Sequence, residues 1–302
     1  MAPQTIKVKK PKKNWTYFFI ALPLMALVFA FSYVPLMGWY LAFVEYTVGQ
    51  PILSSPWVGM KFFKMLFESR DFERIMTNTC MFSLYYIGML VLPPMFAILL
   101  NELKGRRFGK FCQTAATLPN FVSWVLVYSV FYAVFTTDGV VNEILGLFGM
   151  KQKWLSSKKD VYWFQSFVWA WKNVGWKAII YIAAIANVNS DLHEAAAIDG
   201  ANRWARLWKV TFPSILPLII VMFTMRIGLV FRQGFDKVLL LYMPATYDVS
   251  DCLYTYTYRM AFGQTVNYGL STASGLFQSV IGSFLLIVSN KLSKKLSGTS
   301  MI

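Results

Sequence analysis

The sequence predicts an all-α integral membrane protein with six transmembrane helices. Of its 302 residues, 57% are hydrophobic and 14% are charged, with a mean hydropathy of +0.48. In soluble domains, about a quarter of all residues are typically charged. The apolar residues also occur in runs of about 20, enough to cross a hydrocarbon core of about 30 Å. These observations exclude a water-soluble, disordered or disulfide-stapled protein.

Six apolar stretches account for the predicted helices. Four of them, the first, second, third and sixth, contain no Asp, Glu, Lys or Arg. Prolines inside them are tolerated in packed membrane helices. The first stretch is too long for a cleavable signal peptide. The predicted spans are 15–41, 76–100, 111–137, 161–187, 213–240 and 270–290.

The distribution of cations predicts the orientation. Segments 1–13, 101–110, 188–212 and 291–302 hold 15 Lys and Arg in 60 residues, whereas the alternate connecting segments hold 9 in 86. The positive-inside rule places the first set, and so both termini, in the cytoplasm. The net charge of +15 then reflects topology and contact with anionic membrane lipids, and nucleic-acid binding is not expected. The predicted organisation is a basic N-terminus (1–13), a membrane domain (14–296) and a cytoplasmic tail (297–302).

The sequence shows no catalytic motif. Gly105-Arg-Arg-Phe-Gly-Lys110 is one residue short of a phosphate-binding loop and lies between two membrane spans. One histidine and three cysteines form no metal-ligand spacing. We therefore expect no enzyme, no bound metal and no cofactor on this chain.

The predicted inner loop 189–212 contains a helix with a marked beginning and end. Ser190 can cap it, Asp191 suits its first turn, and Gly200 supplies a left-handed stop. A second short basic helix follows and is expected to end at Pro213. A projecting helix lined by alanines is suited to dock into a groove on a partner, although an ordinary interfacial loop helix has the same composition.

The spacing within this loop resembles a known motif. Glu194-Ala-Ala196, Gly200, Val210, Phe212 and Pro213 match the EAA loop of ABC importer permeases, with Val and Phe where the family usually has Ile and Leu. Further segments are similar to LplB-like permeases for complex oligosaccharides, a carbohydrate branch related to the maltose-type components. These segments include Asn101-Glu-Leu-Lys-Gly-Arg-Arg-Phe108, Leu118-Pro-Asn-Phe-Val-Ser-Trp124, Gly139-Val-Val-Asn142, Trp171-Lys-Asn-Val-Gly-Trp176, Thr255-Tyr-Thr-Tyr-Arg259 and Gly275-Leu-Phe-Gln278.

The resemblance, which covers about residues 14–296, implies a type I ABC importer permease fold in a bacterial plasma membrane. It implies a second homologous permease, usually forming a heterodimer, together with two cytoplasmic ATPase subunits that bind the ATP and an external lipid-anchored sugar-binding protein. The loop 189–212, here called the coupling loop, would contact the ATPase. The residues implied for this coupling are Glu194, Ala195, Ala196, Ala197, Asp199, Gly200 and Arg203.

Polar residues within spans four to six are candidates for the translocation path, because such residues usually face a cavity or a partner. We single out Asn173, Arg226, Arg232, Gln233 and Gln278. Arginine can bind a carboxylated or hydroxylated sugar. The cations Lys172, Lys177 and Lys237 can instead reach an interface by snorkelling.

Two other functions share some of these features. An amino-acid or peptide ABC permease would share the Glu-Ala-Ala loop but would lack the surrounding oligosaccharide-type segments. A stand-alone channel or secondary transporter would need a coupling-ion site or repeat symmetry, and the sequence shows neither.

Overall fold

The computed structural model describes residues 15–150, 152–232, 234–241 and 243–297. Within these ranges the chain is helical, with no β-strand beyond one isolated bridge between Val44 and Trp57. The predicted all-α class is confirmed. The basic segment 1–13 and residues 298–302 of the tail lie outside the described residues.

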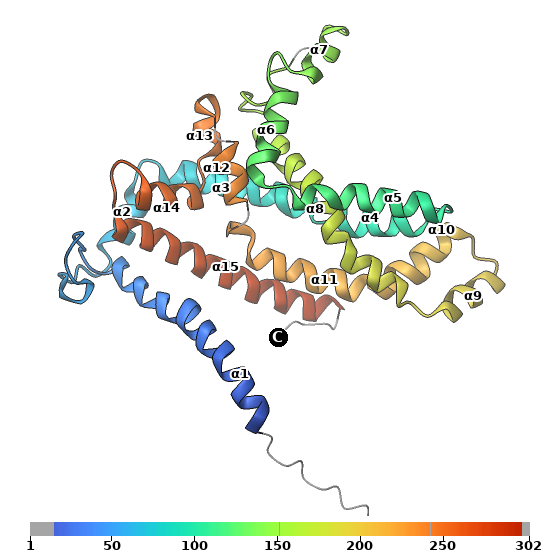
Figure 1. Ribbon diagram of the computed structural model, residues 1–302, viewed down its shortest axis with the longest axis horizontal. Helices are drawn as coiled ribbons and strands as arrows, with labels where there is room; N and C mark the ends of the chain where they lie inside the picture. Colours follow the sequence, from blue (N-terminus) through green and yellow to red (C-terminus); the bar gives the residue numbers. More distant parts are fainter. Residues whose placement is uncertain (1–14, 151, 233, 242, 298–302) are drawn as a thin grey trace, which may run out of the picture.

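The α-helices and the shorter 3-10 and π turns follow one another along an elongated molecule (Figure 1). The α-helices are α1 (Trp15–Val28), α2 (Lys61–Glu68), α3 (Phe72–Met89), α4 (Leu92–Asn101), α5 (Arg106–Thr117), α6 (Trp124–Phe135), α7 (Val140–Gly146), α8 (Val161–Ala186), α9 (Ser190–Ile198), α10 (Arg203–Arg206), α11 (Phe212–Gly228), α12 (Phe235–Leu240), α13 (Tyr247–Ser250), α14 (Leu253–Phe262) and α15 (Tyr268–Ser297). The 3-10 and π segments are η1 (Phe29–Tyr33), η2 (Val34–Ala42), η3 (Ile52–Ser54), η4 (Leu118–Phe121), η5 (Leu207–Thr211), η6 (Val230–Arg232) and η7 (Pro244–Thr246).

Five mainly helical stretches of the described residues are long and apolar enough to cross a membrane. They are Tyr17–Ala42, Phe72–Asn101, Trp124–Gly146, Arg203–Gly228 and Tyr268–Lys295. Each overlaps one of the six predicted spans. The fourth predicted span forms α8, which has 26 residues and is therefore long enough, but is not among these five.

Helix α8 is less apolar because it lies inside the bundle. Twelve of its residues are buried, Gln165, Ser166 and Lys172 among them, and it packs against α3, α4, α5 and α11. At Gly175, an added Cβ would lie 2.1 Å from the carbonyl oxygen of Ala116 on α5. This close approach requires glycine and fixes α8 against α5.

Two predicted spans have different boundaries in the structure. The third does not run unbroken from 111, because η4 interrupts it at Leu118–Phe121 and the membrane-length stretch begins at Trp124. The fifth begins ten residues earlier than predicted, at Arg203, and ends at Gly228 rather than at 240. Its end is explained by η6 and by Gly234, whose φ of 89° no α-helix can accommodate.

The first helix is separated from the rest of the fold. In Figure 1, α1 runs away from the body of the molecule, and none of the apolar window in the stretch Tyr17–Ala42 is buried. Only its C-terminal part, η2, packs against α15. The other long helices form the bundle that positions the coupling loop at one end.

Candidate functional site

The first part of the coupling loop is α9, and its beginning is fixed by Asn189. The side-chain oxygen of Asn189 accepts a hydrogen bond from the backbone N–H of Asp191 at 3.0 Å. The predicted cap, Ser190, is instead the first helical residue, so that prediction was wrong by one position. Both residue types can cap a helix, and Asn189 is the one whose backbone is still non-helical. Asp191 lies in the first turn, as predicted.

Helix α9 ends at a C-terminal capping motif that is centred on Gly200. Gly200 has a φ of 79°, and its N–H donates to the carbonyl of Ala197 at 3.1 Å. The N–H of Ala201 donates to the carbonyl of Ala196 at 2.9 Å. These two bonds form a Schellman motif, which needs a left-handed residue at this position. The predicted stop at Gly200 is confirmed.

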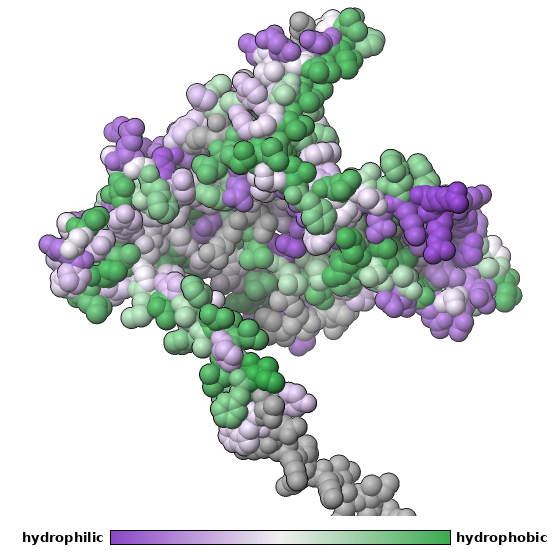
Figure 2. All heavy atoms as spheres, in the orientation of Figure 1, coloured by the Kyte–Doolittle hydropathy of each residue, from purple (hydrophilic) through white to green (hydrophobic). Residues whose placement is uncertain are grey.

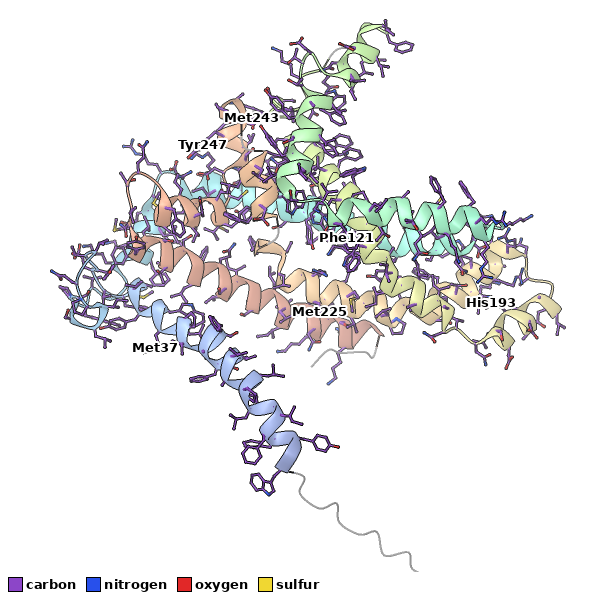
Figure 3. All side chains as sticks on the ribbon, in the orientation of Figure 1. Met37, Phe121, His193, Met225, Met243 and Tyr247 are labelled. Carbon is purple, nitrogen blue, oxygen red and sulfur yellow. The ribbon has the colours of Figure 1, made fainter. Side chains whose placement is uncertain are left out.

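The remaining predicted residues of α9 are available for contact. No residue of this helix is buried, and Glu194, Ala195 and Ala197 are exposed. Ile198 is 88% exposed, which is unusual for a large apolar side chain. His193, on the same helix, lies near one end of the molecule's long axis (Figure 3). Among the described residues, Glu194 has no ion pair.

The second limb of the loop continues directly into a membrane span. Helix α10 is capped by Asn202, whose side chain accepts from the N–H of Ala205 at 2.8 Å. The chain then passes through the π turn η5 into α11, and the N–H of Phe212 donates to the carbonyl of Leu207. The predicted end at Pro213 was therefore wrong, because the π turn accommodates the proline without ending the helix. A displacement of the loop would reach α11 through this unbroken helix.

A salt bridge ties this limb to α4. Nη2 of Arg203 lies 2.9 Å from Oε2 of Glu102 and 2.6 Å from the backbone carbonyl oxygen of the same residue. A hollow of about 380 Å³ adjoins the pair and is also lined by Ser190, His193 and Arg206. Figure 2 shows hydrophilic residues gathered at this end of the molecule. Sequence reasoning missed Glu102, although it is the one acid in the basic segment 101–110.

A second candidate site is a cavity of about 230 Å³ between α4, α8 and α11. The predicted path residue Arg226 lines it together with Lys177. Nζ of Lys177 also lies 5.5 Å from the ring centroid of Trp169. Trp176 and Tyr181 add aromatic walls. The cavity thus combines two cations with aromatic surface.

Asn173 and Lys172 lie elsewhere, at the break between α5 and α6. The buried amine of Lys172 donates to the carbonyls of Pro119 at 3.1 Å, of Asn120 at 2.9 Å and of Val122. The amide oxygen of Asn173 accepts from Nδ2 of Asn120 at 3.4 Å. The amine of Lys172 thus binds backbone carbonyls exposed at this helix break. The structure therefore gives Lys172 a supporting position rather than a place at an interface.

Gln278 contacts the non-α-helical segment between α11 and α12. Its buried amide donates to the carbonyl of Phe231 in η6. Arg232 belongs to the same turn, but its side chain, like the whole of Gln233, lies outside the described residues. Of the three predicted path residues whose side chains the structure describes, Asn173, Arg226 and Gln278, it places Arg226 against the cavity.

An ion cluster on the predicted outer side was not anticipated. Asp251 is fully buried, and its Oδ2 lies 2.9 Å from Nη1 of Arg259 and 3.7 Å from Nη2 of Arg74. Its Oδ1 accepts from Oγ1 of Thr255 at 3.0 Å. The cluster joins the connection after α13 to α3. The sequence signal for this cluster is the run Thr255–Arg259. In the sequence analysis this run served only to show the similarity to oligosaccharide permeases, and no ion pair was predicted from it.

Comparison with known proteins identifies the family. Residues 94–297 match the family model described as binding-protein-dependent transport system inner membrane component. Protein LplB of Bacillus subtilis is 37% identical over 290 residues, covering 94% of this chain and 90% of LplB. The polygalacturonan/rhamnogalacturonan transport system permease protein YteP of the same species is 35% identical, covering 95% and 90%.

The fold is also that of a solved transporter. A chain of a bacterial ABC transporter involved in the import of the acidic polysaccharide alginate superposes with a TM-score of 0.86 at 31% identity, covering 94% of this chain and 97% of that one. The same kind of transporter in complex with an alginate pentasaccharide-bound periplasmic protein gives a TM-score of 0.87 at 30% identity. The predicted resemblance is confirmed, and the chain belongs to the family of binding-protein-dependent transport system inner membrane components, which are permeases and not enzymes.

Proposed function

We propose that this chain is a transmembrane permease subunit of an ATP-binding-cassette importer that takes up oligosaccharides. The observation that carries the proposal is the similarity over nearly the whole chain to permeases named for polysaccharide transport, YteP and the alginate importer. More distant relatives are named for starch degradation products and for multiple sugars. None of these relatives is named for an amino-acid or peptide substrate.

In this proposal, α9 binds a cytoplasmic ATPase subunit. The exposed side chain of Glu194 supplies the polar anchor, and Ala195, Ala196 and Ala197 allow close approach of the ATPase surface. Asp199 and Gly200 end the helix, and Arg203 fixes the second limb to α4. ATP is bound by the ATPase, and closure of the two ATPases moves α9 and, through the continuous helix, α11.

The remaining partners follow from surfaces that this chain leaves uncovered. Helix α1 is apolar and unpacked along its length, which suits contact with a second homologous permease and with lipid. The two permeases would form a heterodimer with the pathway between them. Segments 42–75, 138–160 and 241–269 would face outward and receive a lipid-anchored sugar-binding protein, with both termini in the cytoplasm.

The proposal is tested by purifying the tagged chain from its native membrane in a mild detergent. We expect a second permease and an ATPase to co-purify, and the purified complex to hydrolyse ATP faster with a sugar-loaded binding protein. Recovery of a homo-oligomer without any ATPase, even after chemical cross-linking, would contradict the proposal and favour a channel or a secondary transporter.

A further inference from the structure

Two cations share one cavity without a carboxylate. Lys177 on α8 and Arg226 on α11 both line the cavity between α4, α8 and α11, and no Asp or Glu is among its lining residues. Neither cation takes part in an ion pair within the described part of the chain. Two neutral phenols, Tyr86 and Tyr181, lie close to Arg226.

This arrangement differs from that of two other cations of the bundle, Lys172 and Arg259. The amine of Lys172 is held by three backbone carbonyls at a helix break. Arg259 is paired with Asp251. Each of these two cations is compensated within the fold, whereas Lys177 has no carboxylate or carbonyl partner within the described residues and lies over the face of the Trp169 ring.

Uncompensated cations within a membrane domain are costly and usually mark a substrate or ion pathway. Two like charges around one cavity repel each other, so their placement together favours an anion between them. Arginine binds carboxylates through paired hydrogen bonds, and lysine contributes a point charge.

The walls of the cavity define the rest of the ligand. Trp176 and Tyr181 line it beside the two cations, and aromatic rings pack against the apolar faces of flat, carbon-rich ligands while the polar groups bind at the edge. A sugar ring that carries a carboxylate combines an apolar face with a negative edge. A neutral sugar would leave both cations unpaired.

We infer that the Lys177–Arg226 cavity binds the carboxylate of an acidic saccharide, a uronic-acid unit, on the path through the membrane. This inference rests on the proposed function, whose substrate it makes more specific. The cavity would then be a site within the permease that selects acidic over neutral saccharides, in addition to any selection by an external binding protein.

The test is a binding titration of the purified complete transporter, without binding protein, by saturation-transfer NMR. The probes are trigalacturonate and its neutral counterpart galactotriose. We expect trigalacturonate to bind at least about tenfold more tightly than galactotriose and to weaken with added salt. Lys177→Gln and Arg226→Gln should each weaken its binding by about tenfold, whereas Lys177→Arg should retain it. Lys104→Gln, at an exposed cation outside the cavity, is the control and should bind as the wild type.

Any one of three binding results would overturn the inference. They are equal binding of the two trisaccharides, unchanged trigalacturonate binding in both neutralised variants, and no trigalacturonate binding at all. Loss of a co-purified second permease from Lys177→Gln or Arg226→Gln would also overturn it, because the cations would then be neutralised by a partner's carboxylate. The proposed function fails separately, when no ATPase co-purifies with the wild-type chain.

Discussion

Arg203 and Glu102 are joined twice, through the carboxylate at 2.9 Å and through the backbone carbonyl at 2.6 Å. The two residues lie 101 positions apart, Arg203 in the coupling loop and Glu102 at the end of α4. Because α10 also continues into α11, the coupling loop is attached to two helices that line the charged cavity. This is a direct mechanical connection between the predicted ATPase-binding surface and the predicted path.

Removing this connection should affect coupling more than stability. The pair is partly exposed, with 48% and 31% of the two side chains accessible, and such pairs contribute about 0.2–1 kcal/mol. We expect Arg203→Ala to leave Tm nearly unchanged but to lower the uptake obtained per ATP hydrolysed in proteoliposomes. Lys209→Ala, at an exposed cation of the same limb, is the control. An unchanged ratio of uptake to hydrolysis in Arg203→Ala would show that the pair does not transmit movement.

Substitution of Gly200 should disturb the end of α9 without filling any space. A Cβ there would meet nothing within 4 Å, but the φ of 79° costs other residues about 1–2 kcal/mol. We expect Gly200→Ala to weaken binding of the ATPase by about tenfold, measured by titration in detergent. Gly109→Ala on α5, which has equal space and an ordinary helical φ, should have no effect. Equal affinities for both variants would contradict this reading.

Gly175 should be required for stability, because α8 contacts α5 at this residue. A Cβ at this position would lie 2.1 Å from the carbonyl oxygen of Ala116, so the helices must separate. Overpacking of this kind typically destabilises a protein by about 1–3 kcal/mol. We expect Gly175→Ala to lower Tm in detergent and Gly88→Ala, where nothing lies within 4 Å, to leave it unchanged.

The buried carboxylate of Asp251 should be a major stabilising group of the outer segments. Its removal would take away the carboxylate that lies 2.9 Å from Arg259, and would leave Arg74 with its second carboxylate, Asp71. Breaking a buried ion pair on one side costs about 3–5 kcal/mol. We expect Asp251→Ala to lower Tm strongly, while Asp248→Ala, which removes only an exposed pair with Lys158, changes it little. Similar Tm values for the two variants would show that the cluster is not stabilising.

The thiol of Cys252 should be unreactive over the usual pH range. Burial raises its pKa to about 12, and only the thiolate reacts with maleimide. Its labelling should therefore not increase between about pH 7 and pH 9, in contrast to a free cysteine with a reference pKa of about 8.5. Labelling is followed by mass spectrometry of the folded and the denatured chain, with half-buried Cys112 as the comparison. Rapid labelling of folded Cys252 would contradict its burial.

The sequence predicted the parts of this fold that depend on local composition. Apolar runs located the membrane helices because each residue there must satisfy its backbone within a helix. The glycine stop at Gly200 could be predicted because few other residues adopt a positive φ. Asn189 and Ser190 could not be told apart as caps, since both side chains accept the same hydrogen bond.

Contacts between distant segments could not be predicted. Nothing local to Lys172 indicates that its amine will meet the carbonyls of the break at Leu118–Phe121, and the cation was equally compatible with an interface. Arg226 was predicted to line a path because it is a polar residue within a span, and the structure places it at a cavity with Lys177. Gln278 met the same criterion but serves a helix break.

Glu194→Lys tests most directly whether α9 transmits ATP hydrolysis to transport. The measurement is ATPase activity of the complete transporter in proteoliposomes, with and without the sugar-loaded binding protein, alongside Glu143→Lys at an exposed position on α7. Charge reversal at a polar anchor should cost about 2–5 kcal/mol of binding to the ATPase. We predict that Glu194→Lys reaches the membrane but loses sugar-stimulated hydrolysis and uptake, whereas Glu143→Lys retains both. Normal stimulation in Glu194→Lys would contradict this role of α9.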